Sequence, residues 1–346
     1  MRFFVLILTI LILIGIPVRA LDISAPTAPD VAKDYMPGEP QNLGEGIREI
    51  LRLAVGNARP DLREATKICV GIFVSIMLIA LLRSFPGKTD RIMDLAGVVS
   101  LSVLMLSSSG SLINLASATI THVCEYGRLL LPAMTAALAA QGGITASSAI
   151  YAGTALFDSL LSSLISGILI PLVYIYLALS TVGSAIGVDM LKKCRDWIKW
   201  LMTWILKTIL YIFTGYISIT GVISGTADAA ALKAAKLTIS GVVPVVGGIL
   251  SDASEAILVS AGTVKNAVGI YGLLAIAAIW IGPFVKIGIH YLLLRITGFL
   301  CGIFSGKCLS DLIQDYASAM GMLLGMTGAV CLMFLISLIC FMKGVG

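Results

Sequence analysis

The chain has 346 residues, of which 58% are hydrophobic and 12% are charged, and its mean hydropathy is +1.01. Soluble domains are roughly 45–50% apolar and about 25% charged, so this composition excludes an ordinary soluble protein and predicts an integral membrane protein. The formal net charge of +5 does not indicate nucleic-acid binding, because Lys and Arg gather in the cytoplasmic loops of membrane proteins and the sequence contains no nucleic-acid-binding motif.

Residues 1–20 have the pattern of a secretory signal peptide. Arg2 supplies a positive charge, residues 3–16 form an apolar run, and the small residue Ala20 stands at the predicted cleavage site. An uncleaved N-terminal anchor is the alternative. In both cases the chain that follows begins outside the cytoplasm.

Residues 21–64 are predicted to lie outside the membrane. Four prolines between residues 21 and 40 favour an extended linker. From Gln41 to Asn57, apolar residues repeat at helical spacing, and Glu and Arg side chains occupy the opposite face. This pattern predicts a short amphipathic helix that lies on the bilayer or on a partner.

Residues 65–346 are predicted to form an all-α, polytopic membrane domain. Continuous apolar stretches of about 20 residues favour transmembrane helices, because the strands of a membrane barrel alternate over roughly 10 residues. About seven spans are expected, near residues 65–82, 95–120, 145–182, 200–222, 268–280, 287–304 and 320–341. The third is long enough to hold a break or to be tilted, and the fifth and sixth are joined at Gly282-Pro283.

The distribution of basic residues predicts which turns are cytoplasmic. Basic residues follow the first span at residues 88–91 and the third span at residues 192–199. Alternation from these two turns places the segments 122–154 and 223–266 outside, as extracytoplasmic hairpin regions. With seven spans it also places residues 305–315 outside and the C-terminus inside.

One apolar segment is interrupted by residues that break helices. Residues 238–252 carry Gly241, Pro244, Gly247 and Gly248, which make the segment unsuited to cross a bilayer as one straight helix. One interpretation is a re-entrant hairpin that lines a transport path, where non-helical backbone is tolerated at membrane depth. The other is a tight turn between two helices packed through small residues, which needs no path.

A second apolar fragment with a proline, around Pro132, is similar to this segment. It is followed by Ala152-Gly153-Thr154, as Pro244 is followed by Ala261-Gly262-Thr263. The similarity predicts a parallel repeat with one re-entrant hairpin in each half. The alternative is chance similarity between two apolar, Ala-rich stretches.

Five charged residues flank the interrupted segment. They form either a solvated face with local ion pairs, which adds little stability, or a charged vestibule or docking surface for an extracytoplasmic partner. The five are Asp228, Lys233, Lys236, Asp252 and Glu255.

Arg295 is the best candidate for a buried functional charge. It falls near the middle of a predicted span, where a charge is costly and tends to face the bundle interior or a cavity. Asp158, early in its own helix, is a candidate partner for it. Lys207 and Lys286 are expected to reach the inner membrane surface with their long side chains.

The sequence contains no recognisable catalytic, cofactor or metal site. Its two histidines, His122 and His290, are not part of an HExxH motif. The stretch Gly302–Lys307 lacks both the full pattern of a phosphate loop and an evident histidine partner for a serine nucleophile. We therefore expect no enzymatic activity and no cofactor, so that any energy source must be a partner protein.

The block Ser224–Lys236, continuing through Ile239–Glu255, closely resembles the stage III sporulation protein AE family. The resemblance extends to the signal peptide, the short external region and the order of spans, so it covers nearly the whole chain. It implies a role in endospore formation, within a mother-cell complex in the outer forespore membrane. The implied partners include a secretion-type ATPase and ring-forming membrane proteins, and no catalytic residues carry over.

The resemblance also implies a channel or feeding conduit between mother cell and forespore, formed together with a forespore membrane partner. The leading hypothesis is accordingly a channel or export-platform subunit, similar in character to a permease. One alternative is a self-contained secondary transporter, which the interrupted segments and the predicted repeat favour. The other is a membrane scaffold that anchors the ring-forming partners, which the lack of a strong charged pathway favours.

Overall fold

The computed structural model describes residues 25–38, 43–83, 90–242, 247–304 and 307–343, of which residues 83, 90–91 and 221–261 are described by their backbone alone. All regular elements in these ranges are helices. They are the short 3-10 helix η1 (Asp30–Ala32), α2 (Leu43–Arg83), α3 (Asp90–Ala140), α4 (Ile144–Leu164), the π-helix η2 (Ile165–Leu169), α5 (Ile170–Ile186), α6 (Asp189–Val242), α7 (Gly247–Phe304) and α8 (Lys307–Lys343).

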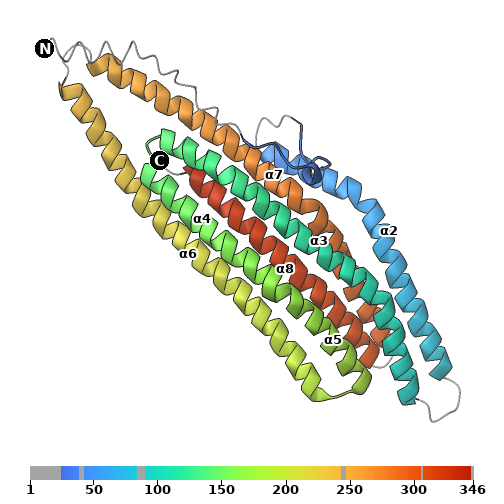
Figure 1. Cartoon of the computed structure of the whole chain (residues 1–346). Helices are drawn as coiled ribbons and strands as arrows, with labels where there is room; N and C mark the ends of the chain where they lie inside the picture. The colour runs from blue at the N-terminus through green and yellow to red at the C-terminus, as the bar shows by residue number, and fades with distance from the viewer. Residues whose placement is uncertain (1–24, 39–42, 84–89, 243–246, 305–306, 344–346) are drawn as a thin grey trace.

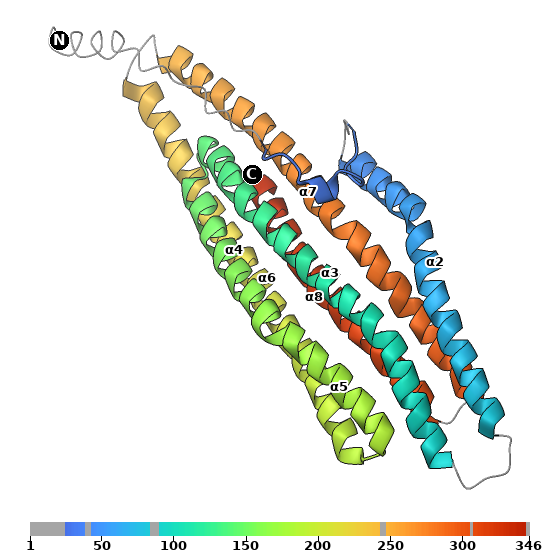
Figure 2. The same ribbon diagram turned by 45° about the vertical axis from the view of Figure 1, so that its right-hand side comes forward.

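The long helices run side by side as an up-and-down bundle (Figure 1). Helices α3 and α8 lie at its centre, with α2 and α7 on one side and α4, α5 and α6 on the other (Figure 2). Within the described residues, six helical rods are long and apolar enough to cross a membrane, counting α4, η2 and α5 as one. The prediction of an all-α, polytopic membrane protein is therefore confirmed.

The count of six, where the sequence predicted about seven, comes from α7. This helix continues through Pro283, where the sequence analysis placed a turn between two spans. A proline inside a membrane helix removes one backbone hydrogen bond, but packed neighbours make this tolerable. Here α7 is held between α2, α3 and α8.

Because α7 is one helix and not two spans, the C-terminal end of α7 and both ends of α8 lie on the sides opposite to those predicted from the sequence. The C-terminal end of α7 and the N-terminal end of α8 lie at the same end of the bundle as the α5–α6 turn (Figure 1). The sequence-based assignment of residues 307–315 to the side opposite that turn, and of Lys343 to the same side, is wrong for this reason. The bundle thus has one end where Lys192, Lys193 and Lys307 gather, which we call the basic end.

Helix α2 joins two segments that the sequence analysis separated. It continues through Pro60 for 41 residues, so the predicted amphipathic helix and the first span form one helix. Its N-terminal half lies on α7, where a Cβ atom added at Gly46 would come within 2.6 Å of Leu274. The missing side chain at Gly46 allows this close approach.

The predicted break in the third span takes the form of a π-helix. Residues Ile165–Leu169 form the π-helical segment, and Pro171 follows in the first turn of α5. Such single-turn insertions let a long helix change direction without ending. The rod from Ile144 to Ile186 therefore stays continuous, and its two halves, α4 and α5, both pack on α3, α6 and α8.

Burial is unequal among the rods. In the most apolar window of each helix, 61% of α7 and 56% of α8 is buried in the bundle, compared with 17% of α2 and 22% of α6. Close glycine contacts tighten the centre, as at Gly127 of α3, which lies directly against Phe334 of α8. The outer faces of α2 and α6 are therefore the ones that meet lipid or another protein.

Candidate functional site

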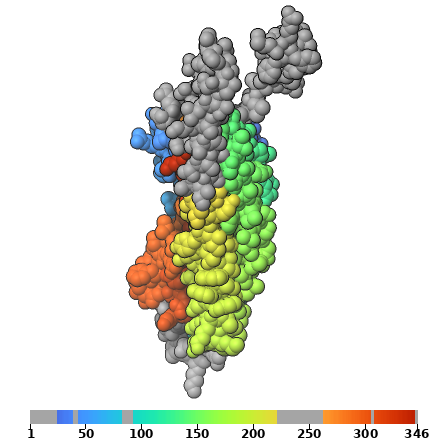
Figure 3. Space-filling model, turned by 90° about the vertical axis from the view of Figure 1, so that its left-hand side faces the viewer, coloured from blue at the N-terminus to red at the C-terminus, as the bar shows by residue number. Residues whose placement is uncertain are grey.

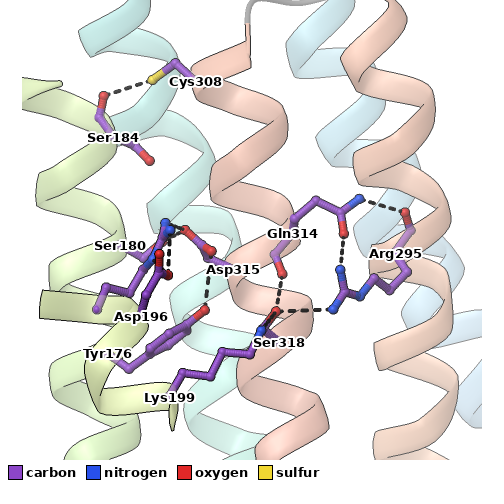
Figure 4. A network of polar contacts seen from close by, with 11 residues as sticks. Tyr176, Ser180, Ser184, Asp196, Lys199, Arg295, Cys308, Gln314, Asp315 and Ser318 are labelled. Carbon is purple, nitrogen blue, oxygen red and sulfur yellow. Dashed lines mark hydrogen bonds and ion pairs between the residues drawn. The ribbon is translucent and has the colours of Figure 1, made fainter. Parts of the chain in front are cut away.

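A polar network lies between α5, α6, α7 and α8 toward the basic end of the bundle (Figure 4). Gln314, Asp315 and Ser318 of α8 stand at its centre. Since residues four apart in a helix lie on one face, Gln314 and Ser318 both turn toward α7, while Asp315 turns toward α5 and α6. The network consists of Tyr176, Ser180, Arg195, Asp196, Lys199, Arg295, Gln314, Asp315 and Ser318.

Asp315 and Arg195 form the charged centre of the network. Arg195 Nη1 donates to Asp315 Oδ2, and the side chains of both residues are shielded, with 14% and 12% of their surface exposed. Ser180 Oγ donates to the same carboxylate oxygen at 2.5 Å, and Tyr176 donates to the other at 3.3 Å. These hydrogen bonds satisfy the acceptor oxygens of a carboxylate that burial would otherwise destabilise.

Two further cations meet at Ser318. Lys199 Nζ and Arg295 Nη2 donate to Ser318 Oγ at 3.2 and 3.3 Å, and Ser318 Oγ donates to the Gln314 carbonyl oxygen at 2.9 Å. A hydroxyl has one donor and two acceptor sites, so Ser318 is fully used. Arg295 Nη1 donates to Gln314 Oε1 at 2.7 Å, and the Arg295 guanidinium lies 5.6 Å from the centroid of the Tyr291 ring.

The charges of the network do not balance. Asp196 and Asp315 both bond to Arg195, whereas the contacts of Lys199 and Arg295 among the described residues are with neutral groups. A cation over an aromatic ring gains some compensation, but it does not gain a counter-charge. The network therefore carries excess positive charge on its α6–α7 side.

A groove of about 510 Å³ adjoins this side. It is bounded by α6, α7 and α8, and Figure 3 shows the face on which α6 (yellow) lies beside the C-terminal part of α7 (orange). Lys199, Lys207, Arg295 and Ser318 line it together with mostly apolar or small residues. We refer to it as the α6–α8 groove.

Short turns explain why these residues meet. In two antiparallel helices, residues equally distant from the connecting turn face each other. Gly187 makes the α5–α6 turn with a left-handed backbone of φ 77°, which sets Ser180 opposite Arg195. The connection between α7 and α8 likewise sets Arg295 beside Gln314 and Ser318.

The sequence analysis identified Arg295 but not its partners. It placed Arg195 and Lys199 in a cytoplasmic loop and Asp315 on the outer side. A sequence signal for these partners exists. Ser180 and Arg195 stand at similar distances from Gly187, and Arg295 and Ser318 stand at similar distances from residues 305–306. The second relation follows only if α7 is one helix.

The predicted pairing of Arg295 with Asp158 is wrong. Asp158, 1% exposed, accepts a hydrogen bond of 2.8 Å from Arg128 Nε, whose side chain is 55% exposed. Lys286, expected to reach the membrane surface, instead binds two carboxylates of α2, Glu64 at 2.8 Å and Asp61 at 3.2 Å. Arg128 and Lys286 thus each have a carboxylate partner on a neighbouring helix.

The interrupted segment falls at the connection between α6 and α7. Gly241 lies in the last turn of α6, and Gly247 and Gly248 lie in the first turn of α7. Both interpretations of the segment depend on Pro244, which lies outside the described residues. Figure 1 shows α6 and α7 extending here beyond the other helices, at the end opposite the basic end.

The five charged residues that flank the segment all belong to these helices. Their side chains lie outside the described part of the chain. Asp228, Lys233 and Lys236 fall within α6, and Asp252 and Glu255 fall within α7.

Pro132 lies inside α3, which continues to Ala140, and its side chain is exposed. The turn follows at Gln141–Gly143, where Gly142 has a φ of 90°. The glycines of the two predicted repeat units both lie at close contacts, Gly153 against Tyr216 and Gly262 against Gln141.

A family model and a curated relative both match this chain, and both carry the same description. The family model described as stage III sporulation protein AE matches residues 31–344. Stage III sporulation protein AE from Bacillus subtilis (strain 168) is 26% identical over 187 residues, which are 54% of this chain and 47% of that relative. The chain thus spans about half the length of this curated relative. No solved structure matches the chain.

Proposed function

Because the chain belongs to the stage III sporulation protein AE family and so has a role in sporulation, we propose that it is a channel or export-platform subunit of the complex that links the mother cell to the forespore. In this proposal it lies in the mother-cell (outer forespore) membrane and is required for late forespore development. It works there with a secretion-type ATPase and ring-forming membrane proteins, which supply the energy and the ring. The chain itself has no catalytic role.

The polar network is the observation that carries this proposal. A shielded ion pair with two additional cations lies between packed helices toward the basic end of the bundle, and charges that face the interior of a membrane helix bundle usually mark a pathway for ions or polar substrates. A chain that served only as an anchor would gain nothing from it, since apolar residues of similar volume would pack as well or better. Arg195 and Asp315 would thus belong to a polar path that partner chains complete.

The length of the helices gives further support. At 1.5 Å per residue, the 54 residues of α6 extend over about 80 Å, whereas the apolar core of a bilayer is about 30 Å thick. The excess projects from the end opposite the basic end, as the α6–α7 hairpin (Figure 1). By the positive-inside rule the basic end is cytoplasmic, which directs this hairpin and the N-terminus toward the space between the two membranes.

The same projecting hairpin favours a second candidate function, a scaffold that holds ring-forming partners. The self-contained transporter was argued from two interrupted apolar segments and a predicted repeat. One of these segments is continuous, since α3 continues through Pro132, and Pro244 of the other lies outside the described residues.

The test removes both charges of the buried pair together. Replacing the pair by amides, as Arg195→Gln with Asp315→Asn, exchanges the ion pair for neutral hydrogen-bonding groups, so that neither partner is left as an uncompensated buried charge, which is the costly result when a buried pair is broken. We expect sporulating cells with this double variant to lose late forespore gene expression. The amount of protein in the membrane and its co-purification with the ring-forming partners should stay normal.

The matched control is Arg128→Gln with Asp158→Asn, which removes an arginine–carboxylate pair between α3 and α4 in which only the carboxylate is buried. These cells should sporulate normally. Normal late gene expression in the network variant as well would remove the basis for the channel proposal. Joint loss of expression and of partner co-purification would support the scaffold instead.

A further inference from the structure

The α6–α8 groove has a polar end and an apolar remainder. Lys199, Arg295 and Ser318 mark the polar end, toward the basic end of the bundle, and the groove follows α8 as far as Leu332. From Ser318 to Leu332 this is about 21 Å of helix, which exceeds the roughly 15 Å of one leaflet of the bilayer core. The groove is therefore long enough for an extended acyl chain.

Small residues of α8 form the floor of the groove. Gly321, Gly325 and Gly328 leave space that side chains fill elsewhere along the helix. A Cβ atom added at Gly328 would meet no atom within 4 Å, and one added at Gly325 would approach Leu206 only to 3.5 Å. Open space beside Gly328 shows that, among the described residues, no neighbouring helix closes the floor.

Three cations line the groove without a counter-charge among the described residues. Lys199 uses one of its three donors on Ser318, and Arg295 uses two nitrogens on Gln314 and Ser318. Lys207 is exposed two turns further along α6. Because helical side chains lean toward the N-terminus of their helix, Lys207 leans toward Lys199. An anion with several acceptor oxygens at the polar end would pair with Lys199 and Arg295, which meet at Ser318.

Tryptophans indicate the depth of this polar end. Trp197, Trp200 and Trp204 flank Lys199 along α6, and each is more than half exposed. Exposed tryptophans of membrane helices gather at the level of the lipid headgroups. Lys199 therefore lies at headgroup depth, with the apolar part of the groove beneath it.

From this arrangement we infer that the α6–α8 groove binds one anionic phospholipid. Its phosphate lies between Lys199 and Arg295, and one acyl chain lies along Gly321, Gly325 and Gly328. Basic sites between membrane helices on the cytoplasmic side are known to hold anionic headgroups. Such a lipid would supply the counter-charge that the network lacks. The inference concerns the isolated chain and does not depend on the channel proposal.

The first test measures lipid retention by native mass spectrometry of the detergent-purified full chain. Mixed micelles contain phosphatidylglycerol or, as the zwitterionic comparison, phosphatidylcholine. We expect one phosphatidylglycerol retained in preference to phosphatidylcholine. Lys199→Gln and Arg295→Gln should each weaken retention about fivefold. Lys193→Gln, which removes an exposed cation at the same end outside the groove, should leave it unchanged.

The second test fills the groove. Gly328→Leu places a side chain in the open space and should abolish phosphatidylglycerol retention without lowering the unfolding temperature. Gly215→Leu is the matched control, because Gly215 is exposed on α6 with no atom near its added Cβ and does not line the groove.

Three outcomes would overturn the inference. Equal retention of the two lipids would show that the cations do not select an anion. Protection from thermal unfolding by inorganic phosphate equal to that by phosphatidylglycerol would indicate a phosphate site without a lipid. If Gly328→Leu changed the oligomeric state while lipid retention stayed intact, the groove would be a helix–helix contact between copies.

Discussion

The α2–α7 site and the polar network both hold a lysine or arginine between helices, and these two sites differ in charge balance. Between α2 and α7, Lys286 is 28% exposed and faces two carboxylates, Asp61 and Glu64. In the polar network, three cations face two carboxylates, and both carboxylates bond to the same arginine, Arg195. At the α2–α7 site the cation is fully paired, as expected of a contact that holds two helices together. The polar network has excess positive charge, as expected of a site that binds an anion.

Breaking the charged centre of the network should have the largest effect. Asp315→Asn leaves the shielded Arg195 without its buried partner, which typically costs about 3–5 kcal/mol. We expect a large fall in the thermal unfolding temperature of the detergent-solubilised protein. Asp196→Asn is the control, because Asp196 binds the same arginine with a side chain that is 65% exposed. Equal effects of the two substitutions would show that burial of the pair is not what matters.

Removing the cation at the α2–α7 site should have an intermediate effect. Lys286→Met deprives Asp61 and Glu64 of a charged donor, and hydrogen bonds to charged groups contribute about 1.5–3 kcal/mol. The exposure of Glu64, 54%, places the expected loss at the lower end of that range. Limited proteolysis should show α2 released from the bundle before the other helices.

A charge reversal sharpens this test. The double variant Lys286→Glu with Glu64→Lys restores one opposite-charge contact and should recover part of the lost stability. Absence of any recovery would mean that apolar packing, such as that of Gly46 on Leu274, holds α2 in place without help from the ion pairs.

Removing a cation of the network that has only neutral partners should have the smallest effect. Lys199→Met loses a single hydrogen bond, to the neutral Ser318 at 3.2 Å, and it leaves no charge unpaired, so the loss should fall below the roughly 1.5–3 kcal/mol typical of bonds that involve a charged group. In lipid-free detergent the unfolding temperature should change little. A fall in unfolding temperature as large as that of Lys286→Met would contradict the view that the positive charge of Lys199 is in excess of the carboxylates of the network.

Several sequence-based expectations depended only on local pattern, and these agree with the structure. Continuous apolar stretches identified a helical membrane protein, because a bilayer requires every backbone group to be bonded within its own segment. Arg295 stood out because a charge within an apolar stretch is costly; the structure places it in the polar network, and its functional role stays a prediction. The amphipathic spacing after Gln41 correctly predicted a helix, which lies on α7.

The expectations about the sides on which the last two helices begin and end depended on one decision about a proline. Pro283 has the same local signature whether it ends a helix or lies inside one, and only the packing of α7 against α2, α3 and α8 decides between them. Splitting α7 at Pro283 moved Asp315 to the wrong side of the membrane. Arg295 was then matched with Asp158, which the structure pairs with Arg128.

The sequence by itself determined the class of the protein, its helical rods and its membership of a sporulation family, because hydropathy and motif similarity are properties of contiguous residues. Only the tertiary structure decided which charges are balanced. Arg195, Lys199, Arg295 and Asp315 come from three helices, and their meeting depends on how turns and proline-containing helices set the register of the bundle. The energy of a charge depends on its neighbours in space, so the network and its groove emerge only when those neighbours are known.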